Sequence, residues 1–80
     1  QIRAQQYADA IELLDTILPD LQQKRLYVQL AIVSVRKGIC LHNLSNDGTE
    51  WIEKGKRILL AMELHEIWDK IEQEIKKYAN

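Results

Sequence analysis

The fold is decided by residues 26–44, "LYVQLAIVSVRKGICLHNL". β-Branched residues are dense here, so the stretch taken alone resembles a buried strand, but its length and its surroundings favour a helix. In helical geometry its apolar and small residues form three stripes, and a helix that is apolar on nearly every side is a central, buried one. The stripes are Leu26, Leu30, Val33 and Leu41; Tyr27, Ala31, Ser34 and Gly38; and Ile32, Val35, Ile39 and His42.

Few residues that break helices surround this stretch. The chain has 3 glycines and 1 proline, which favours long helices joined by short turns. We expect Pro19 to end the first helix, because the residue before a proline avoids helical geometry and proline lacks a backbone donor. Asp20 is then the expected N-cap of the second helix. The sequence predicts an all-α fold in a single domain over residues 1–80, with helices at 3–18, 20–44, 49–62 and 64–78.

The segment "NDGTEWIEKGKR", residues 46–57, has the glycines and the lysine of a phosphate-binding loop. That loop needs GxxxxGK followed by Ser or Thr after a buried strand. The spacing from Gly48 to Gly55 is two residues too long, and Arg57 occupies the hydroxyl position. We therefore interpret the segment as a helix start, capped by Asp47 with Glu50 completing a capping box. Gly55, inside the helix, predicts close packing against another helix.

The last helix is expected to close the stack. One face of this helix is apolar and the opposite face is charged. On the charged face, acidic residues stand four positions before lysines, which is a favourable helical spacing. One apolar face and one solvated face are typical of a capping helix in a repeat array. Trp51 and Trp68 each lie on an apolar stripe, so we expect both in the core. The apolar stripe of this helix is Leu64, Ile67, Trp68, Ile71 and Ile75.

Composition excludes several classes of protein. The formal net charge is −1, so the chain as a whole does not attract nucleic acid or anionic membranes. No apolar run is long enough to span a bilayer, so we expect no membrane contact. Cys40 is the only cysteine, which rules out an internal disulfide and favours a reducing, cytoplasmic setting. Because the chain opens on Gln1 rather than Met, we expect a fragment of a longer protein.

No constellation of residues indicates catalysis, and we expect neither an enzyme nor a cofactor. His42 and His65 lack the neighbouring ligands that a metal site requires, so no metal is expected. Cys40 has Lys37 three residues before it, but we interpret the thiol as structural rather than nucleophilic.

A weak internal repeat suggests how the helices stack. "YADAIELLDTIL" and "WIEKGKRILLAM" share the order aromatic, small, large apolar, which resembles the second helix of a tetratricopeptide repeat. The long helix between them resembles the first helix of the next repeat. The resemblance implies antiparallel helical hairpins of tetratricopeptide-like type with a C-terminal capping helix.

A second resemblance covers residues 26–78. A long apolar helix carrying "RKGICLHNL", a polar turn, "WIEKGKRIL" and a final "AMELHEIWDKIEQEI" are similar to the C-terminal region of Rgg/MutR/GadR-type regulators. Those are cytosolic transcriptional regulators of Gram-positive bacteria. An N-terminal helix-turn-helix domain binds DNA, and a C-terminal tetratricopeptide-like array dimerises and in several members binds short signalling peptides. The resemblance implies the C-terminal part of such a protein, a homodimer and peptide binding, with no nucleic-acid contact from these residues.

The expected binding surface follows from repeat geometry. The first helix of each pair lines the concave face of a helical array. We therefore expect one stripe of the long helix to point into the concavity as a peptide or partner groove. Two alternatives stay open: a preceding helix or a second copy covers this stripe, or the chain is a generic protein–protein interaction scaffold with no sensing role. The candidate residues are Ile32, Val35, Ile39, His42 and Asn43.

Overall fold

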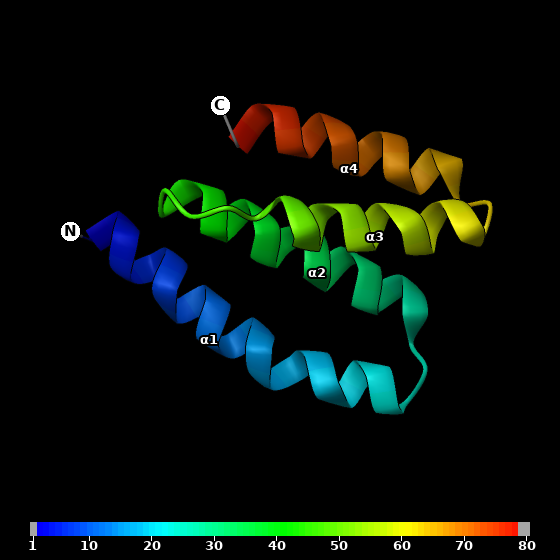
Figure 1. Cartoon of the computed structure of the whole chain (residues 1–80), viewed down its shortest axis with the longest axis horizontal. Coiled ribbons are helices and arrows are strands. Elements are labelled where there is room, and N and C mark those ends of the chain that lie inside the picture. Colours follow the sequence, from blue (N-terminus) through cyan, green and yellow to red (C-terminus); the bar gives the residue numbers. More distant parts are fainter. Residues whose placement is uncertain (1, 79–80) are drawn as a thin grey trace.

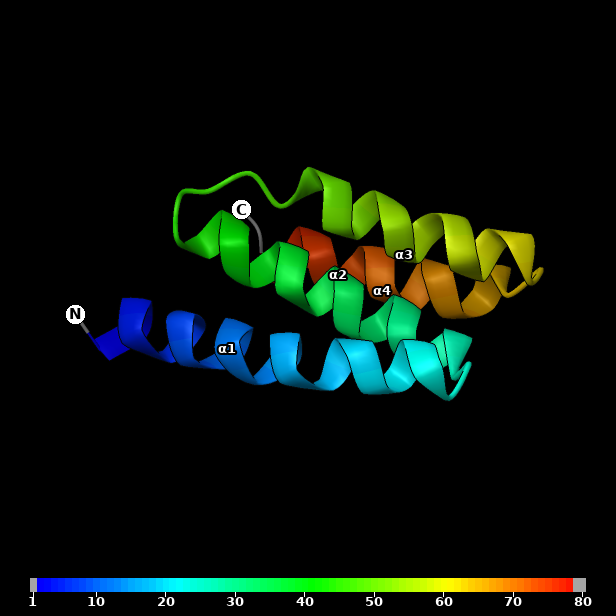
Figure 2. The same ribbon diagram turned by 60° about the horizontal axis from the view of Figure 1, so that its bottom comes forward.

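A computed structural model describes residues 2–78, and the side chains of residues 4–77, as a stack of antiparallel helices (Figure 1). The four helices in this range are α1 (Ile2–Gln23), α2 (Tyr27–Asn43), α3 (Thr49–Ala61) and α4 (His65–Tyr78). α2 packs between α1 and α3, and α4 packs on α3 and α2 (Figures 1 and 2). The prediction of an all-helical chain with α2 at its centre is therefore confirmed.

The predicted boundary between the first two helices is wrong. Pro19 lies inside α1, which continues to Gln23, and Asp20 is a helical residue that pairs with Lys24 at 3.2 Å rather than an N-cap. α2 begins only at Tyr27. The longer α1 keeps Leu18, which is 8% exposed, on the side that faces α2. Burial of this side chain offsets part of the penalty for a proline inside a helix.

Three helices end in the same way. After α1, α2 and α3 a residue other than glycine adopts a left-handed conformation: Arg25 (φ 58°), Ser45 (φ 63°) and Glu63 (φ 60°). The amide of the next residue then donates to the carbonyl five positions earlier, which is the Schellman motif. The donor–acceptor distances are 3.0 Å for Leu26 to Leu21, 2.9 Å for Asn46 to Leu41 and 2.9 Å for Leu64 to Leu59.

Glycines bring α2 and α3 into close contact. A Cβ atom added at Gly55 would lie 2.6 Å from the Ala31 carbonyl oxygen, and one at Gly38 would lie 2.7 Å from the Gly48 carbonyl oxygen. Only hydrogen at these positions allows the two backbones to approach so closely. The prediction that Gly55 packs against another helix is confirmed, and Ala31 and Gly38 of α2 lie at the same close contact.

The turn before α3 differs in part from the predicted capping box. Gly48 occupies the N-cap position, and the Asp47 carboxylate accepts a hydrogen bond from the Thr49 amide at 3.0 Å. This bond lowers the pKa of Asp47 below its ordinary value. Within the described residues Glu50 makes no side-chain hydrogen bond, so the return half of the box is absent.

The core lies among α2, α3 and α4. Trp68 is 7% exposed, as the sequence predicted, whereas Trp51 is only half-buried and lies outside this cluster. The one buried polar side chain among the described residues, Ser34, donates its hydroxyl to the Leu30 carbonyl at 2.7 Å, so its burial leaves no unsatisfied group. The buried cluster consists of Ala31, Val35, Leu59, Trp68 and Ile71.

Candidate functional site

An apolar hollow lies where α1, α2 and the C-terminal half of α4 meet. Its volume is about 280 Å³. α1 and α4 do not pack on each other, and all three helices contribute residues to the lining of the hollow. We call this hollow the α1–α4 groove. It is lined by Ala10, Leu13 and Leu14 of α1, Arg36, Ile39 and Cys40 of α2, and Glu74 of α4.

The groove combines an apolar lining with charges at its edge. Leu13 is 62% exposed, the most exposed of the large apolar side chains among the described residues. Arg36 and Glu74 are also exposed, and within residues 4–77 neither side chain has a hydrogen-bond or ion-pair partner. An apolar hollow with an unpaired cation and an unpaired carboxylate can accept apolar side chains from a ligand that carries charges of its own.

Cys40 contributes a thiol to the lining of this groove. Burial raises its pKa above the ordinary value, so the thiol keeps its proton at neutral pH. Lys37 is engaged elsewhere, and burial alone accounts for the shift, so neither Lys37 nor Arg36 lowers this pKa. Because the thiolate is the reactive form, a raised pKa disfavours nucleophilic chemistry at this position, and a structural role for the thiol stays a prediction.

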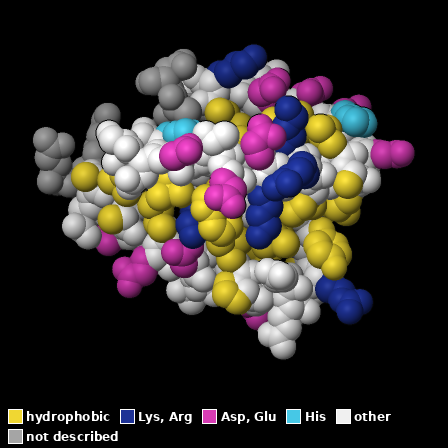
Figure 3. Space-filling view, viewed as in Figure 1, with side chains coloured by type: hydrophobic (Ala, Val, Ile, Leu, Met, Phe, Trp, Pro, Cys, Tyr) yellow, Lys and Arg dark blue, Asp and Glu magenta, His cyan; other side chains and the backbone are white. Residues whose placement is uncertain are grey.

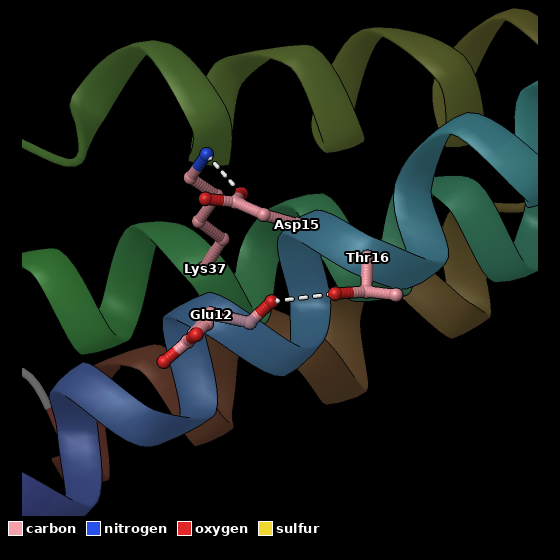
Figure 4. A network of polar contacts seen from close by, with 4 residues as sticks. All are labelled: Glu12, Asp15, Thr16 and Lys37. Atoms are coloured by element: carbon pink, nitrogen blue, oxygen red, sulfur yellow. Dashed lines mark hydrogen bonds and ion pairs between the residues drawn. The ribbon is translucent and has the colours of Figure 1, made fainter.

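Lys37 links three helices. Its ammonium group forms an ion pair with the Asp15 carboxylate of α1 (Figure 4). The same group lies 4.0 Å from the centre of the Trp51 ring of α3. The Lys37 side chain is 13% exposed, so the cation is largely shielded from water. Lys54 approaches the same ring at 5.3 Å. Figure 4 also shows the Thr16 hydroxyl donating to the Glu12 carbonyl within α1, at 3.0 Å.

The sequence analysis missed this link. Asp15 and Lys37 are 22 residues apart on different helices, and helical periodicity relates residues within one helix only. The available signal was a lysine on a helix predicted to be buried on nearly every side, because a charge in that position needs a partner. From the sequence, Lys37 was interpreted only as a neighbour of Cys40.

The five residues predicted to form a groove are only partly brought together. Val35 is 2% exposed and belongs to the core, and Ile32 packs against that core. His42 is half-buried, and Asn43 is exposed with its side-chain amide donating to the Ile39 carbonyl at 2.9 Å. Ile39 alone of the five also lines the α1–α4 groove. A binding role for this set stays a prediction.

Charge on the surface is mixed. Figure 3 shows acidic and basic side chains interspersed around exposed apolar ones, with no large area of one sign on the face drawn. Among the described residues, no group of three or more His, Cys, Asp or Glu side chains is placed to hold a metal ion. No helix within residues 2–78 combines the length and the apolarity needed to cross a bilayer.

No family model matches this chain, and neither a curated protein nor a solved structure is significantly similar to it. The function is therefore inferred from the helices and from the groove between them.

Proposed function

We propose that this chain is a non-enzymatic protein-interaction module that self-associates and binds a short apolar peptide, as the C-terminal region of Rgg/MutR/GadR-type regulators does. The observation that carries the proposal is the α1–α4 groove. Its lining is apolar, and Leu13 at its edge is 62% exposed. Exposed apolar surface beside a hollow is typical of a site that binds a protein or a peptide.

The arrangement of helices that we propose is tetratricopeptide-like. α2 and α3 would form the complete pair, α1 the second helix of the preceding repeat, and α4 the cap. Two contacts support this assignment: α2 and α3 are the most closely packed neighbours through their glycines, and α4 rests on both. In such arrays each unit contacts only its neighbours, which agrees with the lack of packing between α1 and α3 or α4.

The mechanism we propose is thermodynamic linkage. A peptide that binds one association state or arrangement of the chain better than another shifts the population toward the favoured state. If DNA-binding domains are attached to the two chains, their separation changes with that population, and the coupling is reciprocal. The residues described here supply the peptide site and the contact between chains, and none of them contacts DNA.

Peptide binding is tested by titrating the 15N-labelled chain with short synthetic peptides of leucine, isoleucine and valine that carry one aspartate. We expect saturable shifts of the amide signals of Leu13, Leu14, Ile39 and Cys40. Leu13→Asp should abolish saturation. The matched control is Leu26→Asp, because Leu26 is also an exposed leucine (41%) but does not line the groove. Shifts that do not saturate, or that survive Leu13→Asp, would contradict peptide binding in the groove.

The regulator assignment has a separate test in the gene. We expect the reading frame upstream of the codon for Gln1 to encode a helix-turn-helix domain. An unrelated domain in that place would overturn the regulator assignment and leave a generic helical-repeat scaffold as the function.

A further inference from the structure

The α1–α4 groove presents complementary features on one face. Leu13 lines the hollow with 62% of its surface exposed, and Ile39 and Cys40 line the same hollow. Arg36 and Glu74 are both at the rim, and neither has a partner in the described part of its own chain. The face therefore contains an exposed leucine, a hollow, a positive charge and a negative charge.

A face of this kind can pair with itself. In a two-fold dimer both chains use the same patch, so residue i contacts residue j of the partner while j contacts i. Each feature then needs its complement within the same patch. In this groove the exposed leucine is complementary to the apolar hollow, and the positive charge is complementary to the negative one. The formal net charge of −1 adds little repulsion between two copies.

We propose that a second copy of this chain occupies the groove across a two-fold axis. Leu13 of each chain packs into the hollow of the other. Arg36 pairs with the partner subunit's Glu74, and the reciprocal pair forms on the other side of the axis. This inference rests on the self-association in the proposed function and names its surface.

Occupation of the α1–α4 groove by a second copy has a regulatory consequence. An apolar peptide and a second copy would enter the same hollow, so each excludes the other. Peptide binding would then separate the two chains, because a ligand that binds only the open groove draws the population toward monomers.

Charge reversal tests the pairing. The dimer dissociation constant is measured by sedimentation equilibrium for the unmodified chain, Arg36→Glu, Glu74→Arg and the double variant. Each single reversal replaces two attractive contacts by two repulsive ones, so we expect dissociation constants at least about tenfold higher. The double variant restores both pairs with their signs exchanged and should return to within about threefold of the unmodified chain.

The matched control is Arg57→Glu, which makes the same charge change at an exposed position of α3 outside the groove. Its dissociation constant should stay within about twofold, since charge at a distance is screened. All the substituted side chains are exposed, and circular dichroism is used to establish that each variant remains folded.

Cys40 gives a second measurement at the same surface. It is the only cysteine of the chain and it lines the groove, so a second copy in the groove should shield it from iodoacetamide. We expect its alkylation rate to fall by about fivefold or more between concentrations below and above the dissociation constant, because the thiol must be accessible to react. Arg36→Glu should keep the rate high at both concentrations.

The outcomes separate this inference from the function on which it rests. A chain that stays monomeric at all concentrations overturns the interface and also the self-association. A dimer that is insensitive to both reversals, or that leaves Cys40 equally reactive, overturns the interface alone. Weakening by both single reversals without recovery in the double variant also overturns it, because the two side chains would then not face each other.

Discussion

Lys37 shows how one residue connects elements that are distant in sequence. Its cation is shared between the Asp15 carboxylate and the Trp51 ring, which joins α1 and α3 to α2. Asp15 is half-exposed, so solvent weakens the ion pair. The contact with the ring adds an attraction of about 0.5–1 kcal/mol.

Lys37→Met should lower the free energy of unfolding by about 1–2 kcal/mol, because it removes both attractions and keeps most of the aliphatic stem. Urea denaturation provides the measurement. Lys54→Met is the control: Lys54 approaches the same ring at 5.3 Å and has no carboxylate partner among the described residues, so the loss should be smaller. The difference between the two variants should shrink in 1 M salt, where ion pairs are screened. Equal losses would contradict the role of Asp15.

Gly55→Ala tests the close approach of α2 and α3. Alanine is the better helix former by about 1 kcal/mol, but its Cβ would lie 2.6 Å from the Ala31 carbonyl oxygen. We expect the collision to outweigh the propensity and to destabilise the chain by about 1–3 kcal/mol in thermal or urea unfolding. Glu53→Ala, at an exposed position of the same helix, should change stability by no more than about 0.5 kcal/mol. A stabilised Gly55→Ala variant would mean that the helices are further apart.

Cys40 predicts a pH dependence. Burial raises the pKa of its thiol, so above the ordinary value of about 8.5 the folded chain holds a proton that the unfolded chain has lost. The stability that comes from this protonated thiol is present below that pH and is lost as the pH rises through the folded pKa. Between pH 7 and 10, Cys40→Ala should therefore lose less stability in urea unfolding than the unmodified chain. An equal or larger loss in the variant would contradict the raised pKa.

At the scale of single residues, the sequence predicted a contact correctly where one residue type has one physical consequence. Gly55 inside a helix indicated a close neighbour, and the neighbour is there. Lys37 was not interpretable in the same way, because its two partners are set by how the helices pack. The same limit applies to the groove: Ile39 was predicted, whereas Leu13 and Glu74 come from helices whose positions the sequence does not specify.

At the scale of helices, the ends depend on hydrogen bonds rather than on residue type. Pro19 was expected to end the first helix, but the helix continues to Gln23 and ends in a Schellman motif in which Arg25 is left-handed. The predicted starts of α3 and α4 agree with the structure to within one residue, since a turn segment precedes each. No sequence signal indicates that an arginine, serine or glutamate adopts a left-handed conformation. The end of the first helix was therefore misplaced.

Glu63→Gly should stabilise the chain. Glu63 holds a φ of 60° after α3, a conformation that costs a residue with a side chain about 1–2 kcal/mol and costs glycine almost nothing. Part of this gain is lost to the greater freedom of glycine in the unfolded chain, so we expect a net gain of roughly 0.5–1 kcal/mol in thermal unfolding. Glu53→Gly within α3 should instead lose about 1 kcal/mol. A loss of stability in both variants would contradict the left-handed turn.

At the scale of the whole molecule, α2, α3 and α4 share one core and α1 is attached to α2 alone. The prediction of a central apolar helix correctly placed α2 among the other helices, because a helix that is apolar on all sides needs neighbours on all sides. Periodicity did not reveal which faces would remain open. The groove exists because α4 covers the α3 side of α2 and leaves the side toward α1 uncovered, which is a property of packing among three helices.

Trp68→Ala should destabilise the chain by about 3–5 kcal/mol, since Trp68 is 7% exposed and joins α4 to the shared core. Guanidinium unfolding followed by circular dichroism gives the value. Trp51→Ala should cost less, because that ring is only half-buried. A loss below about 1 kcal/mol for Trp68→Ala, the level of a surface substitution, would mean that α4 does not close the core.

The attachment of α1 through a single neighbour also determines what a protease could remove. The turn between α1 and α2 carries Lys24 and Arg25, both exposed, and trypsin cleaves after these residue types at accessible turns. Cleavage at this turn would release the N-terminal fragment that contains Leu13 and Asp15. The helices α2, α3 and α4 would stay covalently joined and packed around Trp68. The groove would lose one wall in that single cleavage, while the rest of the molecule kept its core.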